Sequence, residues 1–175
     1  MSPVTFNGNQ LPQADDVKYL GMHLDRRLTW KKHIWTKRKQ LGIKFTSLYW
    51  LINQKSQLSF ENKLLIYKAI LKPIWTYGIQ LWGSASTSNI EILQRFQSKT
   101  LRVITNAPWY VPNNVIHRDL NVKTVKSEIS TFSEKYQHRL LCHPNELAVK
   151  LVNPTRQYNR LKRSNPLDLV RRFSQ

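Results

Sequence analysis

The fold of this chain is decided by one stretch, Val17-Lys18-Tyr19-Leu20-Gly21-Met22-His23-Leu24-Asp25, which runs at once into Leu28-Thr29-Trp30-Lys31-Lys32-His33-Ile34. Its first part alternates well enough to predict a strand over residues 17–24, interrupted at Gly21 where the backbone must bend or approach another group closely. Thr29 is a candidate N-cap, so a long basic helix is expected from about Trp30 to Ile52. A short strand segment that leads into helices predicts a mainly α protein.

Towards the N-terminus, the sequence indicates a second small β element. Asn7-Gly8 separates Val4-Thr5-Phe6 from Asn9-Gln10-Leu11, and this dipeptide is typical of a two-residue hairpin turn. Pro12 ends the second arm.

Towards the C-terminus, apolar residues recur at helical spacing. In the basic helix they form the stripe Ile34, Leu41, Phe45, Leu48 and Ile52. Ser59 caps a second helix, which is apolar nearly all round from Leu64. We expect Pro73 to kink this buried helix, which continues through Trp82 until Gly83 ends it.

Further helices complete the predicted bundle. The capping box Ser88-Asn89-Ile90-Glu91 starts a helix that runs to about Asn106, with Ile90, Leu93, Leu101 and Ile104 facing inward. A short helix is expected at 114–119, a longer one at 125–141 and one more at 146–151. The chain then divides into a strand segment (1–28), a helical bundle (29–107), a C-terminal helical region (108–153) and a basic, loosely ordered tail (154–175).

The charge of the chain points to a polyanionic partner. It carries 28 Lys and Arg against 10 Asp and Glu, a formal net charge of +18, and has a pI of about 10.3. No carboxylate occurs between Asp25 and Glu61, whereas a helix that needs only solubility normally mixes signs. Nucleic acid is therefore the first partner to consider, although a soluble basic protein without one remains the alternative.

Eight cations are the candidate phosphate contacts, which would hold a backbone without reading its sequence. The competing interpretation is a solvated helix face. Three tryptophans, Trp30, Trp35 and Trp50, could stack on bases, but helical aromatic residues more often belong to the core. The eight candidates are Lys31, Lys32, Lys37, Lys39, Lys44, Arg95, Lys99 and Arg102.

Several other classes of protein are disfavoured. The single cysteine, Cys142, excludes an intrachain disulfide, and residues 1–16 do not resemble a signal peptide, so a nuclear or cytoplasmic location, not secretion, is expected. Charges and Pro73 interrupt the stretch 64–82, so no membrane partner is expected. His138, Cys142 and His143 are too few and too close for a typical zinc site. There is no P-loop and no glycine-rich dinucleotide fingerprint.

A set of ordered blocks resembles the reverse transcriptases of Jockey-like non-LTR retrotransposons, from the end of the palm through the thumb to the C-terminal region. The resemblance covers essentially the whole chain, and the ordered set is more specific than any single block. The blocks are Tyr19-Leu20-Gly21 with Leu24-Asp25 and Trp30, Lys63 to Lys68, Ile70 to Gly78, Leu93 to Arg102, and Ile104 to Tyr110.

The resemblance implies positions for these residues. Tyr19, Leu20 and Gly21 would lie in the primer grip, which holds the primer 3′ end, and Gly21 lacks a Cβ that would keep backbone away from a nucleotide. The helices to residue 107 would be the thumb, which grasps the RNA/DNA template–primer duplex.

The resemblance also implies that the polymerase carboxylates lie upstream of these blocks. Ala14-Asp15-Asp16 looks like the metal-binding motif of that family, but Pro12 interrupts the strand that should precede it and no acid occurs before Asp15. Asp15 and Asp16 are therefore expected in a loop, where they start a strand or cap a turn. No metal or other cofactor is predicted for this chain, because Mg²⁺ would belong to the palm, and the chain alone is expected to be inactive as a polymerase.

Two functions follow. The first is a segment of an RNA-directed DNA polymerase that retains the primer grip and thumb without the catalytic carboxylates. The alternative is a helical protein-interaction module that needs the remainder of a polymerase, or another partner, supplied in trans.

Overall fold

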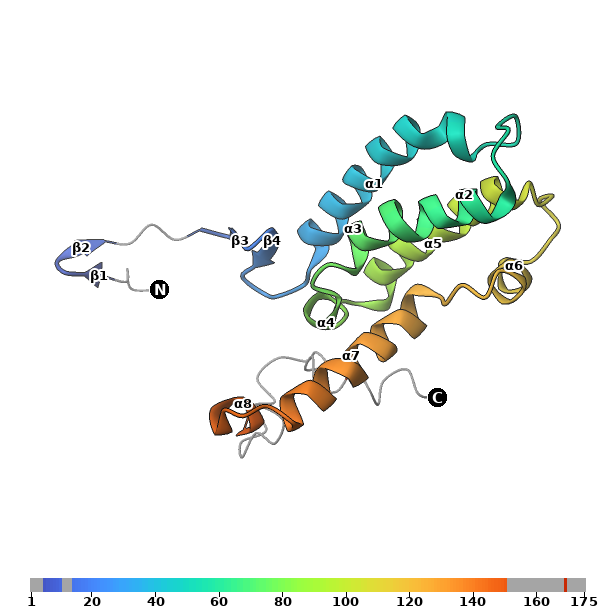
Figure 1. Cartoon of the computed structure of the whole chain (residues 1–175). Helices are drawn as coiled ribbons and strands as arrows, with labels where there is room; N and C mark the ends of the chain where they lie inside the picture. Colours follow the sequence, from blue (N-terminus) through green and yellow to red (C-terminus); the bar gives the residue numbers. More distant parts are fainter. Residues whose placement is uncertain (1–4, 11–13, 151–168, 170–175) are drawn as a thin grey trace.

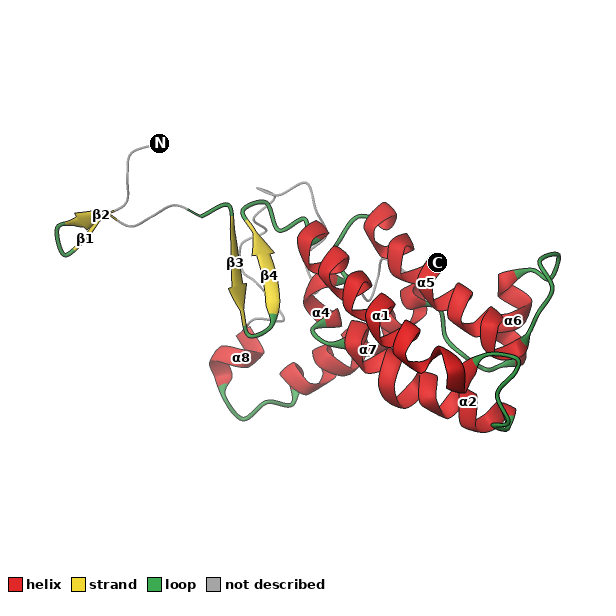
Figure 2. Ribbon diagram, turned by 90° about the horizontal axis from the view of Figure 1, so that it is seen from above, coloured by secondary structure: helices red, strands yellow, loops and turns green. Residues whose placement is uncertain are grey.

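Helices form most of the protein, as the sequence predicts (Figure 1). The structure is a computed structural model that describes residues 5–10, 14–150 and 169. Two small β ribbons at the N-terminal side lead into a group of packed helices (Figures 1 and 2). The mainly α fold class is therefore confirmed.

Each β ribbon is an antiparallel pair with a two-residue turn. β1 (Thr5–Phe6) pairs with β2 (Asn9–Gln10), and Asn7 and Gly8 between them both have positive φ, as the sequence predicts. β3 (Asp16–Tyr19) pairs with β4 (Met22–Asp25). A single interrupted strand over 17–24 is therefore wrong: Leu20 and Gly21, at φ 45° and 75°, reverse the chain and make a hairpin.

The chain enters α1 (Lys31–Ile52) through a loop that Asp25 organises. The Asp25 carboxylate accepts hydrogen bonds from the backbone N–H groups of Thr29 (2.8 Å) and Trp30 (2.9 Å) and from the Thr29 hydroxyl (2.7 Å). Thr29 is therefore not the N-cap: Trp30, at φ 60°, precedes the helix and makes no side-chain cap. The helix itself, and the burial of Ile34, Leu41 and Ile52 on its inner stripe with Phe45 and Leu48 partly covered, agree with the prediction.

The apolar segment after Ser59 is broken at a different point from the one expected. It forms α2 (Phe60–Ile66), a π-helical turn η1 (Tyr67–Leu71), α3 (Lys72–Thr76) and, after Tyr77 and Gly78, α4 (Ile79–Trp82). The π turn ends directly before Pro73 and places it in the first turn of α3, where its missing N–H costs little. The break lies at Gly78, which has φ 66°.

The remaining helices follow the predicted order. α5 (Thr87–Thr105) is capped by Ser86, whose hydroxyl accepts from the Asn89 N–H, and not by Ser88. It is followed by α6 (Asn113–Asp119), α7 (Val125–Leu141) and α8 (Glu146–Lys150). The predicted end at Leu151 and, apart from Leu169, the basic tail over 154–175 lie outside the described residues.

A shared core holds α1, the α2–α3 segment, α5 and α7 together. Trp75, Trp82, Ile90 and Leu101 are almost fully buried in it, and all four α5 residues expected to face inward are buried. Trp30 also belongs to the core, with its indole N–H donated to the Ser84 hydroxyl (2.9 Å). Stacking of Trp30 on a base is therefore ruled out in this fold.

Candidate nucleic-acid interface

A groove of about 700 Å³ lies between the N-terminal halves of α1 and α5. Its apolar floor includes Ile92, Phe96 and Trp35, whose indole is 48% exposed. Because Lys31, Trp35 and Lys39 are four residues apart on a helix, they project from one face of α1. The full lining is Lys31, Trp35, Arg38, Lys39, Ser88, Asn89, Ile92, Arg95, Phe96 and Lys99.

The groove is positively charged, and no acidic side chain that lines it offsets this charge. Five of its lining side chains are cations and none is a carboxylate. In the part of the chain that the structure describes, none of these five cations forms an ion pair, and nearby Glu91 is bound to Lys126 at 2.8 Å. Such a concentration of one sign raises the local potential and attracts anions.

Arg38 is placed by its contact with the groove floor. Its guanidinium carbon lies 4.8 Å from the centre of the Phe96 ring, on which it stacks. Gly42, one turn along α1, leaves room for this arginine, since a Cβ there would lie 3.2 Å from an Arg38 terminal nitrogen. Arg38 is not among the eight predicted cations, and no local pattern indicates its role because its stacking partner is 58 residues away in the chain.

Only half of the eight predicted cations meet in this groove. Lys31, Lys39, Arg95 and Lys99 line it. Arg102 does not, because its guanidinium donates to the carbonyl oxygens of Pro108 and Val111 and to the Asn113 side chain. The charge pattern on α5 does not indicate that Arg102 binds the following loop, because the oxygen atoms that accept its hydrogen bonds lie beyond the end of the helix.

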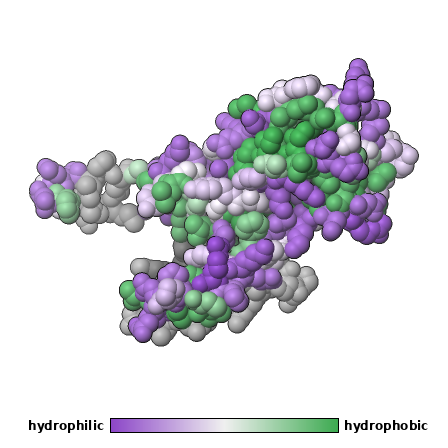
Figure 3. Space-filling model, in the orientation of Figure 1, coloured by the Kyte–Doolittle hydropathy of each residue, from purple (hydrophilic) through white to green (hydrophobic). Residues whose placement is uncertain are grey.

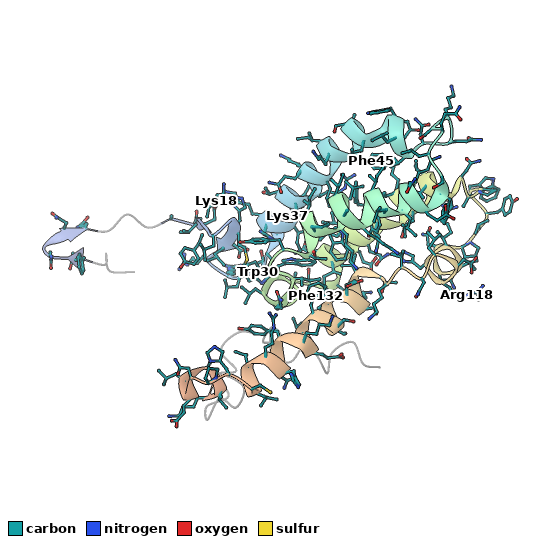
Figure 4. The ribbon with its side chains drawn as sticks, viewed as in Figure 1. Lys18, Trp30, Lys37, Phe45, Arg118 and Phe132 are labelled. Atoms are coloured by element: carbon teal, nitrogen blue, oxygen red, sulfur yellow. The ribbon has the colours of Figure 1, made fainter. Side chains whose placement is uncertain are left out.

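The other three predicted cations lie elsewhere on α1. Lys32 forms an ion pair with Asp16 (2.5 Å). Lys44 is exposed and does not line the groove. Lys37 is half-buried on the side of α1 that faces the β3–β4 hairpin, where Lys18 also lies (Figure 4). Burial and the charge of Lys18 lower the pKa of Lys37.

The three predicted primer-grip residues form the tip of the β3–β4 hairpin. Tyr19 and Leu20 are 62% and 71% exposed, and the tip is anchored from below by Tyr77, whose hydroxyl donates to the Leu20 carbonyl at 2.5 Å. Gly21 lies close to the same ring: a Cβ added at Gly21 would be 3.6 Å from a ring carbon of Tyr77. Lys37 completes the contact, with its ammonium 5.0 Å from the centre of the Tyr77 ring.

A buried histidine joins the hairpin to α1. His33 is 1% exposed, and its Nδ1 accepts a hydrogen bond from the His23 backbone N–H at 3.3 Å. Burial, assisted by the charges of Lys37 and His23, lowers the pKa of His33 to about 4. The imidazole is therefore neutral near pH 7, and its role is to join β4 to α1.

The acidic and metal-ligand candidates are dispersed. Asp16 is held by Lys32, and Asp15 lines a separate open hollow with Asp25. His138 lies on α7, and Cys142 and His143 follow the helix on an exposed turn. Over residues 5–10, 14–150 and 169, no group of three or more His, Cys, Asp or Glu side chains could hold a metal ion. No helix among those residues is long and apolar enough to cross a membrane.

Comparison with curated proteins identifies the relatives of this sequence. It is 46% identical over 170 residues to the probable RNA-directed DNA polymerase from transposon X-element of Drosophila melanogaster, a match that covers 97% of this chain and 19% of that protein. The chain is homologous to one segment of the RNA-directed DNA polymerases of jockey-like mobile elements. The RNA-directed DNA polymerases from mobile element jockey of Drosophila melanogaster and Drosophila funebris are 40% and 38% identical to it over 95% and 97% of its length.

The polymerase homology concerns a limited part of those proteins, because the chain spans about a fifth of the length of the curated relatives it matches. No protein-family model matches the sequence, and no solved structure matches it.

Proposed function

We propose that this chain is a template–primer binding element of a jockey-like RNA-directed DNA polymerase, with the groove between α1 and α5 as its contact with the nucleic-acid backbone. The observation that carries the proposal is the convergence of five cations from two helices on one groove that contains no carboxylate. Phosphates would neutralise these side chains and release the counterions condensed on the duplex.

The shape of the groove favours a backbone over a base as its ligand. It is an open hollow flanked by long cationic side chains, and such side chains hold phosphates without selecting sequence. The aromatic rings of Trp35 and Phe96 lie in the same hollow and offer flat surface to a sugar or an end base. A polymerase that copies any template needs binding of this sequence-independent kind.

The hairpin tip is the proposed primer grip. Tyr19 and Leu20 project from a turn whose position relative to α3 is set by the hydrogen bond from Tyr77. Lys18 and Lys37 supply positive charge at the same junction, so a primer strand beside the tip would meet both an exposed aromatic side chain and cations. The chain's own part in polymerisation would be to hold and orient the primer, whereas the carboxylates and their Mg²⁺ would come from the palm of a longer polymerase.

The proposal is tested by fluorescence anisotropy of a labelled RNA–DNA primer–template from low to physiological salt. Five phosphate contacts predict a slope of about −4 to −5 in a plot of log K against log salt concentration. Replacement of Lys39, Arg95 and Lys99 by alanine should reduce that slope to about −2 and weaken binding strongly.

A matched control removes the same charge elsewhere. Lys55, Lys68 and Lys135 are exposed and lie outside the groove, so their replacement by alanine should leave the slope close to that of the unmodified chain. Failure of the unmodified chain to bind at low salt, or equal losses in the two triple variants, would refute the proposal.

A second candidate function is an interaction surface for the rest of a polymerase. An apolar surface spreads over α1 and α2 (Figure 3). Apart from Trp35 in the groove, the exposed large apolar side chains of these helices are Ile43, Tyr49, Trp50, Phe60 and Leu65. The β3–β4 hairpin is a two-stranded ribbon in which β4 meets α1, so the outer edge of β3 could pair with a further strand. Aggregation of the isolated chain that a polymerase partner cures, and nucleic acid does not, would favour this function.

A further inference from the structure

The loop that joins α5 to α6 presents two adjacent aromatic side chains to solvent. Trp109 is 89% exposed and Tyr110 is 68% exposed. Their ring centres lie 6.0 Å apart at an angle of 81°, so the two rings support each other edge to face. Single exposed aromatic residues are common on protein surfaces, but two in succession on one turn place an unusual amount of ring surface in water.

This aromatic turn, residues 108–111, is held by several hydrogen bonds. The Val111 N–H donates to the Pro108 carbonyl (3.1 Å) and closes the turn. Arg102 spans it from α5, donating to the carbonyl oxygens at both ends and also to Asn113 Oδ1 (2.8 Å) at the start of α6. Three hydrogen bonds from one arginine constrain the backbone that carries the two rings, which lowers the entropic cost of binding a ligand.

The aromatic turn continues the line of the basic groove. Arg95, Lys99, Arg102 and Asn106 are spaced so that they fall on one face of α5, and the first two line the groove. Asn106 ends the helix in the left-handed conformation, and the turn begins two residues later. At 1.5 Å per residue, the end of α5 is about 10 Å beyond Lys99, a distance spanned by a few nucleotides of an extended strand.

We infer that the Trp109–Tyr110 turn is a stacking site for unpaired bases of a nucleic-acid strand that leaves the α1–α5 groove. The inference deepens the proposed function, on which it rests for the direction of the strand. Aromatic faces bind bases of any sequence, and a row of cations leading to such faces is the arrangement found in single-strand binding surfaces. A protein ligand would not need the uncompensated cations that precede the turn on α5.

The test compares three labelled probes at one salt concentration: a blunt duplex, the same duplex with six unpaired adenines on the template strand, and a free strand of twelve nucleotides. The unmodified chain should bind the overhang probe more tightly than the blunt duplex. The variant Trp109→Ala, Tyr110→Ala should remove that advantage, with a loss of about five- to thirty-fold for the overhang probe and no change for the blunt duplex.

Two further variants exclude a merely structural effect. Trp109→Phe retains an aromatic face and should keep most of the overhang advantage. Phe6→Ala removes another exposed aromatic ring, 67% exposed on the remote β1–β2 ribbon, and should change nothing. Arg102→Ala should lower the overhang advantage even though both rings remain, because it frees the turn.

The outcomes separate this inference from the proposed function. Suppose that the groove variant loses blunt-duplex binding, while the unmodified chain and the aromatic variant each bind all three probes equally. This result would support the groove and overturn the stacking site. If the unmodified chain does not bind the duplex but binds the single strand in a way that depends on Trp109, the proposed function is overturned and the stacking site is retained. Single-strand and overhang binding that are unchanged in the aromatic variant overturn the inference in either case.

Discussion

The two flanks of α1 satisfy their polar groups in opposite ways. On the flank that meets the hairpin, specific short contacts join the two elements: His33 accepts from the backbone of His23, and Tyr77 holds Leu20 while lying under Lys37. On the flank that meets α5, cations gather with no acidic partner. The first arrangement fixes a geometry, and the second leaves charge available for a ligand.

The contrast predicts different costs of substitution. A residue at the hairpin junction touches several neighbours, so replacing it should change the free energy of unfolding. A cation in the groove makes few internal contacts, so replacing it should change nucleic-acid binding while leaving stability nearly constant.

The largest effect on stability is expected at Gly78, where the break between α3 and α4 packs against Met22 of the hairpin. A Cβ there would lie 2.5 Å from the Met22 sulfur, and the φ of 66° disfavours any L side chain. Gly78→Ala should lower the free energy of unfolding by about 3 kcal/mol, measured by urea denaturation followed by circular dichroism.

Gly42→Ala is the matched control for that substitution. Gly42 lies within α1, and a Cβ would meet only the terminal nitrogen of Arg38, which can move. Alanine at this helical position should stabilise the chain by about 0.5 to 1 kcal/mol. Equal effects of the two substitutions would show that the hairpin is not packed tightly against the helix break.

A smaller effect should follow from the titration of His33. The pKa of His33 is about 4 in the folded chain, below the ordinary value of about 6.5, so the fold favours the neutral imidazole. The stability that this provides is complete above pH 6.5 and is lost as the pH falls from 6.5 towards 4, because the unfolded chain gains the proton first. We expect a loss of about 2 kcal/mol over that interval.

Urea denaturation of the unmodified chain and of His33→Gln, as a function of pH, measures this contribution. His33→Gln should flatten the dependence between pH 4 and 6.5, whereas His143→Gln, on the exposed turn after α7, should retain it. The same steep dependence in both variants would assign it to other groups.

Tyr77→Phe tests the anchor of the hairpin tip by itself. It removes the hydrogen bond to Leu20 but keeps the ring beneath Lys37. The free energy of unfolding should fall by about 0.5 to 1 kcal/mol. Hydrogen exchange of the amides in β3 and β4 should accelerate while exchange in α5 stays constant, and uniform acceleration would contradict a local anchor.

The smallest effect on stability is expected in the groove. Replacement of Lys39, Arg95 and Lys99 by alanine should shift the free energy of unfolding by less than about 1 kcal/mol, and relief of charge repulsion opposes the loss of side-chain packing. The urea midpoint, measured beside the binding experiment, checks this. A loss as large as that of Gly78→Ala would remove the distinction between the two flanks.

Local signals predicted most of the helices and fewer of their ends. Val125–Leu141 and the inner stripe of α1 follow directly from helical periodicity, and the Asn7-Gly8 turn follows from its dipeptide. The N-cap of α1 was misassigned to Thr29 because nothing local indicates that the Asp25 carboxylate binds the Thr29 hydroxyl and the N–H groups of Thr29 and Trp30. The break at Gly78 was not predicted, because the segment was expected to continue as one helix to Trp82, and the π turn before Pro73 has no signature in one sequence.

The sequence predicted the basic character of the candidate site but only some of the residues that line it. Charge and the order of the family-like blocks pointed to the basic face of α1 and α5. Helix spacing alone did not separate Lys39, in the groove, from Lys37, two residues away and facing the hairpin. Arg102 was counted as a phosphate contact because no local pattern indicates that three acceptors beyond the end of α5 converge on its guanidinium.

The sequence by itself determined the mainly α fold, the excess of positive charge and the family of polymerases to which the chain is related, since periodicity, composition and ordered blocks are properties of neighbouring residues. The tertiary structure decided which cations share a groove, which are held by Asp16 or Tyr77, and which aromatic side chains remain in water. Those outcomes depend on where α1, α5 and the hairpin meet. That meeting is set by packing between residues tens of positions apart, such as Phe96 with Arg38 and Gly78 with Met22.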